Sequence, residues 1–169
     1  MTETTDDWQR RIDAVWADDA LDDDDRVAAI DALAAELGDE HPVALFERAG
    51  ARDSAGRETE AEPLYRAALG AGLDPGRRTR AVIQLASTIR NLGHLDEALG
   101  LLRAEYEATR GADMQDEAAA FYALALVSSG DAVRGASVAL TALAPHLSRY
   151  TRSVRGYAAE LLDPRPRNE

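Results

Sequence analysis

The chain has 169 residues, no cysteine and a formal net charge of −12. The lack of cysteine excludes a disulfide framework and a thiolate zinc site, and binding to nucleic acid would need a basic face. No apolar run approaches the ~20 residues that a membrane span requires, and the acidic beginning is unlike a secretory signal. We therefore expect a cytoplasmic protein that binds neither nucleic acid nor membranes.

The first forty residues form an acidic module. Residues 1–40 hold 14 acidic residues and 3 arginines, whereas residues 41–169 hold 17 acidic residues and 16 arginines. Apolar residues at helical spacing predict helices near 5–19 and 24–38. The two apolar faces are Trp8, Ile12, Val15 and Trp16, and then Val27, Ile30, Leu33 and Leu37. We interpret the module as a charged cap, although it could also attract a basic partner.

Four aspartates, Asp22 to Asp25, separate these two helices. A calcium-binding loop would need glycine at its sixth position and glutamate at its twelfth. Counted from Asp22, those positions hold Val27 and Leu33. The run is therefore interpreted as an N-cap and first helical turn, and no metal site is predicted.

A longer pattern follows, because glycine recurs at predicted turns every 37 residues, at Gly56, Gly93 and Gly130. An apolar helical stretch precedes each glycine and an amphipathic stretch follows it. The predicted helices lie near 42–55, 58–70, 76–92, 95–109, 114–129 and 132–144. A period of this length is typical of stacked helical hairpins, because one hairpin cannot bury its apolar face alone.

The middle copy is the clearest: Leu85-Ala86 is a large–small pair, Gly93 the turn, Ala98 a small crossing residue and Leu102 a large one. The same offsets give Arg48-Ala49, Gly56, Ala61 and Tyr65 upstream, and Tyr122-Ala123, Gly130, Gly135 and Ala139 downstream. Over residues 42–145 this pattern resembles the tetratricopeptide repeat. The resemblance implies an all-α, right-handed superhelix of three hairpins, in which Ala86 faces Ala98 and Ala49 faces Ala61. The chain also resembles a group of small bacterial tetratricopeptide proteins of unassigned function, some expected to dimerise.

A last helix is predicted near 147–162. It places Tyr150, Val154, Tyr157 and Leu161 on one face, which we expect to cover the last repeat. Residues 164–169 are expected to form a tail. We expect one domain over residues 1–169, made of the acidic module, three repeats over 42–145, a capping helix over 146–163 and the tail.

Residues suited to catalysis are sparse. The histidines His41, His94 and His146 lie far apart in the sequence, and none begins an H-E-x-x-H pair. Because all 19 basic residues are arginine, the chain has no lysine for a Schiff base or a phosphate-binding loop. We therefore predict a protein that is not an enzyme and has no catalytic residue, cofactor or metal.

The candidate binding residues lie on the first helix of the middle repeat. Arg80, Gln84, Ser87 and Asn91 are spaced i, i+4, i+7 and i+11, with Arg90 beside them. They lie opposite the predicted core residues Val82, Leu85, Ala86 and Ile89. In the repeat family, first helices line a concave groove, so these five residues are predicted to bind a peptide backbone or carboxylate. The alternative is that they form the solvated face of an amphipathic helix.

Groove positions of the neighbouring repeats are apolar. They are Val43 and Phe46 in the first repeat, and Ala120, Leu124 and Val127 in the third. These side chains could receive apolar anchors, or be covered within the protein or by a second subunit.

Three functions are consistent with these patterns. The first is a scaffold that binds a segment of another protein in the groove, and the second is a structural homo-oligomer that uses the groove and terminal helices in self-association. The third is an enzyme built on a helical solenoid. A homodimer is expected from the resemblance and from the aromatic residues of the terminal helices, which are Trp8, Trp16, Tyr150 and Tyr157.

Overall fold

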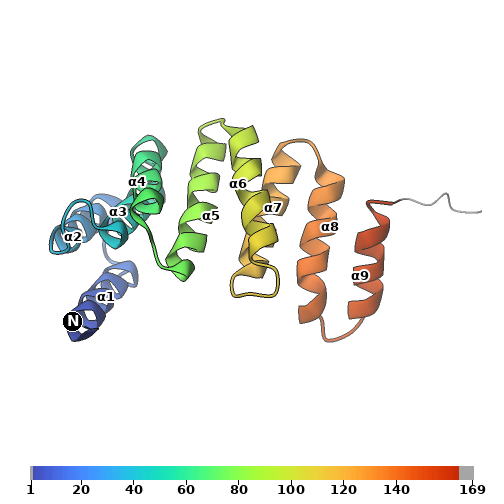
Figure 1. Cartoon of the computed structure of the whole chain (residues 1–169), viewed down its shortest axis with the longest axis horizontal. Helices are drawn as coiled ribbons and strands as arrows, with labels where there is room; N and C mark the ends of the chain where they lie inside the picture. Colours follow the sequence, from blue (N-terminus) through green and yellow to red (C-terminus); the bar gives the residue numbers. More distant parts are fainter. Residues whose placement is uncertain (1, 164–169) are drawn as a thin grey trace, which may run out of the picture. The chain divides into compact units, whose positions relative to one another are not determined.

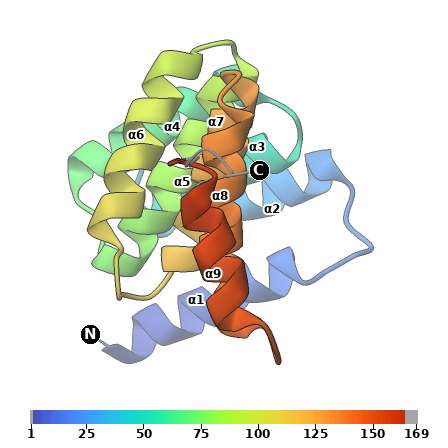
Figure 2. The same ribbon diagram turned by 90° about the vertical axis from the view of Figure 1, so that its right-hand side faces the viewer.

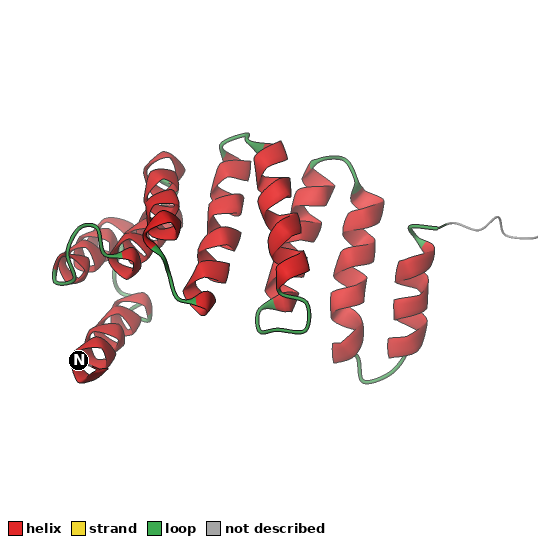
Figure 3. Ribbon diagram, viewed as in Figure 1, coloured by secondary structure: helices red, strands yellow, loops and turns green. Residues whose placement is uncertain are grey.

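The computed structural model describes the backbone of residues 2–163 and the side chains of residues 6–163. Over this range the chain forms nine α-helices and one short 3-10 turn, with no strand (Figure 3). The predicted tail lies outside the described residues. The helices are α1 (Thr2–Trp16), α2 (Asp23–Ala35), α3 (Pro42–Ser54), α4 (Glu58–Ala71), α5 (Pro75–Asn91), α6 (Leu95–Ala108), α7 (Gln115–Ser128), α8 (Ala132–Leu143) and α9 (Thr151–Glu160), with the 3-10 turn at Ala144–His146. The all-α prediction is confirmed.

The helices divide between two compact units, Met1–Leu92 and Gly93–Glu169. Helices α1 to α5 belong to the first unit, and α6 to α9 belong to the second (Figure 1). The boundary falls inside the middle repeat, at its glycine turn. A single domain over the whole chain therefore stays a prediction, as does contact between Ala86 and Ala98.

The three repeating glycines occupy the turns that the sequence predicts. Gly56, Gly93 and Gly130 have φ values of 69°, 92° and 91°. Glycine adopts this left-handed conformation without the steric penalty that a Cβ atom brings, so it ends a helix and reverses the chain. Beyond the first and last of these turns, the amides of Arg57 and Asp131 donate to carbonyls five residues earlier, at 2.8 and 2.9 Å.

Small residues lie where the two helices of a hairpin cross. In α8, a Cβ atom added to Gly135 would lie 2.9 Å from the carbonyl oxygen of Ala123 on α7. The helices are therefore too close for any side chain at this position. In the first repeat, Ala49 and Ala61 are both fully buried. The sequence pattern of small residues thus marks buried positions in both hairpins.

The N-terminal module has its own apolar core. Trp8, Ile12, Ile30 and Leu33 are buried together between α1, α2 and α3. The Trp8 indole N–H donates to the carbonyl oxygen of Leu33 at 2.8 Å, which satisfies its one polar group. At the start of α2, Asp22 accepts from the amide of Asp25 at 2.8 Å. The prediction that the aspartate run forms an N-cap and first turn is confirmed.

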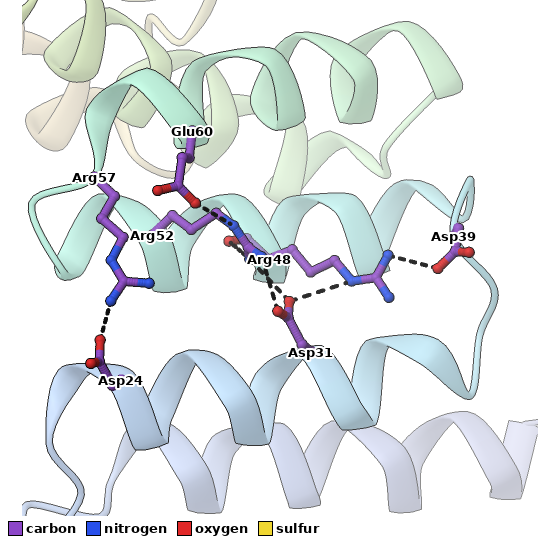
Figure 4. Close-up of polar contacts among 7 residues, drawn as sticks. All are labelled: Asp24, Asp31, Asp39, Arg48, Arg52, Arg57 and Glu60. Atoms are coloured by element: carbon purple, nitrogen blue, oxygen red, sulfur yellow. Dashed lines mark hydrogen bonds and ion pairs between the residues drawn. The ribbon is translucent and has the colours of Figure 1, made fainter.

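Ion pairs join the acidic module to the first repeat (Figure 4). Asp31 of α2 accepts from both terminal nitrogens of Arg52 on α3, each at 2.9 Å. Arg48 contacts Asp39 at 3.0 Å, and Arg57 contacts Asp24. Arginines of the first repeat therefore neutralise part of the module's charge. These ion pairs attach α2 and the turn after it to the first repeat.

The prediction of which face of the capping helix packs against the last repeat is wrong. Helix α9 packs against α8 through Ala158, which is fully buried and whose carbonyl oxygen accepts from the Ser137 hydroxyl at 2.7 Å. Tyr150 and Tyr157, expected to cover the last repeat, are 74% and 64% exposed. The small Ala158 allows the close approach that this hydrogen bond requires, and a tyrosine at the same place would prevent it.

Candidate functional site

Helix α5 carries all five candidate binding residues. It starts at Pro75, after Asp74 accepts from the amide of Arg77 at 3.0 Å, so a proline at the first position and an aspartate N-cap fix its beginning. Its apolar side is buried as predicted. The residues there are Val82, Leu85, Ala86 and Ile89, each at most 5% exposed.

The predicted binding residues run along another side of α5, and we call Arg80, Gln84, Ser87, Arg90 and Asn91 the α5 stripe. Arg80 and Asn91 are exposed, whereas Gln84, Ser87 and Arg90 are half-buried. Arg80 and Asn91 are eleven residues apart, about three helical turns, so they lie on one side of the helix. Arg90 lies at the edge of the stripe, where its guanidinium is 3.4 Å from the side-chain oxygen of Asn91.

Arg80 is held in place by an aromatic ring. Its guanidinium carbon lies 5.2 Å from the centroid of the Phe46 ring on α3, a distance at which cation–π attraction acts. Neither Arg80 nor Arg90 forms an ion pair with a carboxylate of the described residues. In a chain with many more acids than arginines, the stripe thus has two cations available for an acidic ligand.

The amide of Gln84 is incompletely satisfied. Its Oε1 atom is buried and accepts no hydrogen bond within the described part of the chain. The buried Nε of Arg77, seven residues earlier on α5, donates none there. A buried polar atom without a partner usually costs about 1–3 kcal/mol. Such atoms are rare in folded proteins, and here two lie on the same side of α5.

Helix α1 contributes to this surface, which the sequence analysis did not predict. The Trp16 indole N–H donates to Glu47 of α3 at 2.8 Å, and its ring lies 3.4 Å from a Cβ atom built on Gly50. Gln9 accepts from Arg77 of α5 at 2.6 Å. Helix α1 therefore touches the first helices of two repeats, and only its apolar spacing was visible in the sequence.

Two carboxyl groups beneath this surface have raised pKa values. Burial raises the pKa of Glu47, which is only 4% exposed, although the Trp16 hydrogen bond and nearby Arg80 oppose the change. Burial also raises the pKa of Asp53, and this is partly offset by the hydroxyl of Thr88, which donates at 2.8 Å. Tyr65 lies 3.4 Å from the same carboxylate, and burial raises its pKa strongly.

The apolar groove positions of the two outer repeats differ in exposure. Phe46 of the first repeat is 2% exposed, because it lies against Tyr65 and under Arg80. Leu124 and Val127 of the third repeat are each 52% exposed. Phe46 is therefore covered within the protein and Val43 is half-buried, whereas the positions on α7 remain open.

The three histidines divide between the two units, His41 in the first and His94 and His146 in the second. His41 and His94 directly precede α3 and α6, and neither side chain caps its helix. His146 lies 2.8 Å from Asp116 on the exposed surface of the second unit. The described residues contain no group of three histidine, aspartate or glutamate side chains arranged to hold a metal ion. Among them, no helix has both the length and the apolar character needed to cross a membrane.

Comparison with known proteins identifies the repeats. No curated protein and no solved structure matches the chain. A family model described as Tetratrico peptide repeat matches residues 42–161, which is more than half of the chain and extends from the start of α3 through α9. The 37-residue period, its glycines Gly56, Gly93 and Gly130, and the small crossing residues all fall within this match. The chain belongs to the tetratricopeptide-repeat family.

Proposed function

We propose that this protein is a non-enzymatic scaffold that binds a segment of another protein along the α5 stripe. Repeats of this family commonly serve as scaffolds for protein–protein interaction. The observation that carries the proposal is that, among the described residues, two arginines of the stripe form no ion pair and the side-chain oxygen of its glutamine is buried without a hydrogen bond. Water satisfies polar groups on a solvated helix face, but it does not reach the buried Oε1 atom of Gln84.

Each residue has a role that follows from its chemistry. Arg80 and Arg90 attract carboxylates of the segment, and Arg80 is already oriented by Phe46. The amides of Gln84 and Asn91 can each donate and accept, so they suit the paired groups of a peptide backbone. Ser87, between them, is small enough to let the segment approach α5 closely.

The proposal is tested with the variant Gln84→Ala/Asn91→Ala. Partners recovered by the immobilised wild-type protein are identified by mass spectrometry, and the binding of one purified partner is then measured for both proteins. We expect binding to weaken at least tenfold, about 1.4 kcal/mol. Stability should change by about 0.5 kcal/mol or less at Asn91, because it is exposed.

The matched control is Arg103→Ala/Glu107→Ala, which removes an exposed ion pair of α6. It changes two surface side chains outside the stripe and should leave binding unchanged. If the stripe variant binds as well as the wild type while remaining folded, the stripe is only a solvated face.

A structural homo-oligomer is the second candidate. It is favoured by the exposed apolar side chains of the second unit, which lie on α7, α8 and α9 and directly before and after α9. Large exposed apolar areas commonly mark interaction surfaces. The mass of the protein in solution separates this candidate from a monomeric scaffold.

A further inference from the structure

Helix α1 presents two different sides to the rest of the first unit. Trp8 and Ile12 are buried in the apolar core of the acidic module. Gln9 and Trp16 are seven residues apart and therefore lie on one side of the helix. They contact the first helices of two repeats, α5 and α3 respectively. Figures 1 and 2 both show α1 at the edge of the first unit, connected to α2 by a loop.

The side of α1 that meets α3 and α5 is the less firmly held. The backbone of α1 lies close to that of α2, whereas α1 reaches α3 and α5 through side chains. The contact with Arg77 leaves the buried Nε of that residue without an acceptor among the described residues. At Glu47, burial is the main cause of the raised pKa, and the negative charge of Asp13 on α1 raises it further. Each contact thus has an unfavourable feature that separation of α1 from α3 and α5 would relieve.

These contacts lie at the beginning of the α5 stripe. Arg77 precedes Arg80 by three residues and Gln84 by seven, so the three side chains share one side of α5. The guanidinium of Arg77 donates to the neutral amide of Gln9 at 2.6 Å and forms an ion pair with Asp74 at 2.7 Å. A carboxylate is a stronger acceptor for a guanidinium than a neutral amide is. An acidic segment that follows the stripe toward the start of α5 therefore competes with Gln9 for Arg77.

We propose that α1 is an autoinhibitory helix, which pivots on α2 and releases Arg77 when an acidic segment of a partner protein binds along the α5 stripe. This inference rests on the proposed function and adds the regulation of the same site. In the free protein, Gln9 and Trp16 hold α1 over the start of the stripe. In the bound protein, a carboxylate of the segment replaces Gln9 at Arg77, and Trp8 and Ile12 keep α1 attached to α2.

The pivot lowers the apparent affinity of the free protein for its partner. A ligand that binds only the open state binds in proportion to the fraction of molecules that are open. Removal of the acceptor on α1 therefore raises the affinity, although no residue of the α5 stripe changes. A helix α1 that served only as a structural cap would not have this effect.

Gln9→Ala tests this expectation in the full chain, because it removes the acceptor on α1 and leaves the α5 stripe in place. The purified partner from the binding experiment above should bind this variant at least about threefold more tightly than the wild type. Arg10→Gln is the matched control, because Arg10 is on the same helix but its side chain is 76% exposed. This control should bind as the wild type does, and circular dichroism verifies that both variants are folded.

Spin labels measure the pivot directly, because the chain has no cysteine of its own. One pair of labelled cysteines replaces the exposed residues Ala14 on α1 and Ala67 on α4. A second pair replaces Ala67 and the exposed Ala28 on α2. Binding of the partner should change the distance between the first pair, measured by double electron–electron resonance, and leave that between the second pair unchanged. Gln9→Ala should broaden the first distance distribution even without the partner.

The outcomes separate the proposed function from its regulation. If the partner binds through the α5 stripe while the distance from Ala14 to Ala67 stays fixed, the proposed function is kept and autoinhibition is overturned. Equal affinity of Gln9→Ala and the wild type has the same meaning. If neither the wild type nor Gln9→Ala binds a partner through the stripe, the proposed function and its regulation are both overturned.

Discussion

At the scale of single residues, glycines in this protein differ in what surrounds them. Gly135 lies at a helix crossing where an added Cβ atom would be 2.9 Å from both the Ala123 oxygen and the Val127 methyl carbon. Gly100 lies inside α6 with open space around its Cα atom. Both are helical, so the difference between them is one of packing rather than of backbone conformation.

These two glycines make a matched pair. Gly135→Ala should lower the free energy of unfolding by about 1–3 kcal/mol, because the backbone of Ala123 must move away. Gly100→Ala should raise it by about 0.5–1 kcal/mol, because alanine is the better helix former where nothing is obstructed. Urea denaturation measures both. Equal effects at the two positions would show that the crossing is looser than the structure indicates.

At the scale of elements, the contact between α2 and α3 depends on one aspartate. Asp31 holds Arg52 through two hydrogen bonds and lies 3.6 Å from Arg48. The arginine side chains are 18% and 16% exposed, so water screens this cluster less than an open ion pair. Asp39, at the edge of the same cluster, is 86% exposed.

Asp31→Asn should therefore destabilise the protein by about 1–3 kcal/mol, because it weakens a two-point contact to a charged group. Asp39→Asn should cost about 0–1 kcal/mol, as is usual for an exposed ion pair. Thermal or urea unfolding of both variants provides the comparison. High salt should reduce the effect of Asp39→Asn more than that of Asp31→Asn.

The sequence predicted the positions of the helices and turns well, but it did not predict how all of the helices pack. Helices and turns could be predicted because their signals are local: Gly56, Gly93 and Gly130 require positive φ, and the apolar spacing between them marks a helix. The buried face of α9 could not, because two tyrosines outweigh Ala158 in any apolar pattern. The contact between Trp16 and Glu47 joins residues 31 apart, and no periodicity within either helix encodes it.

At the scale of the whole molecule, pH should affect stability through buried acids. The pKa values of Glu47 and Asp53 are raised by burial. For such groups the folded state binds the proton more tightly than the unfolded state, so their contribution is complete at low pH and is lost as pH rises through the folded pKa. Arginines lower the pKa values of Glu36 and Asp74. The stability that these two groups contribute is therefore lost as pH falls through their folded pKa values.

As pH rises above the usual pKa of a glutamate, the free energy of unfolding of the wild type should fall. That of Glu47→Gln should fall less, because the variant has no charge to bury. Its amide oxygen can still accept from Trp16. Urea denaturation at several pH values measures the difference. Parallel curves for the two proteins would mean that Glu47 does not titrate differently on folding.

The pairing of α2 with the first repeat limits how this protein can be shortened for experiments. A fragment that begins with the family match at residue 42 would lack Asp24, Asp31 and Asp39. Arg48, Arg52 and Arg57 would then lose those counter-charges, and Gly50 would lose the Trp16 ring that covers it. Such a fragment would display a cationic surface that the full chain neutralises. It would collect acidic proteins from a cell extract for reasons unrelated to the native surface, so interaction studies require residues 1–41.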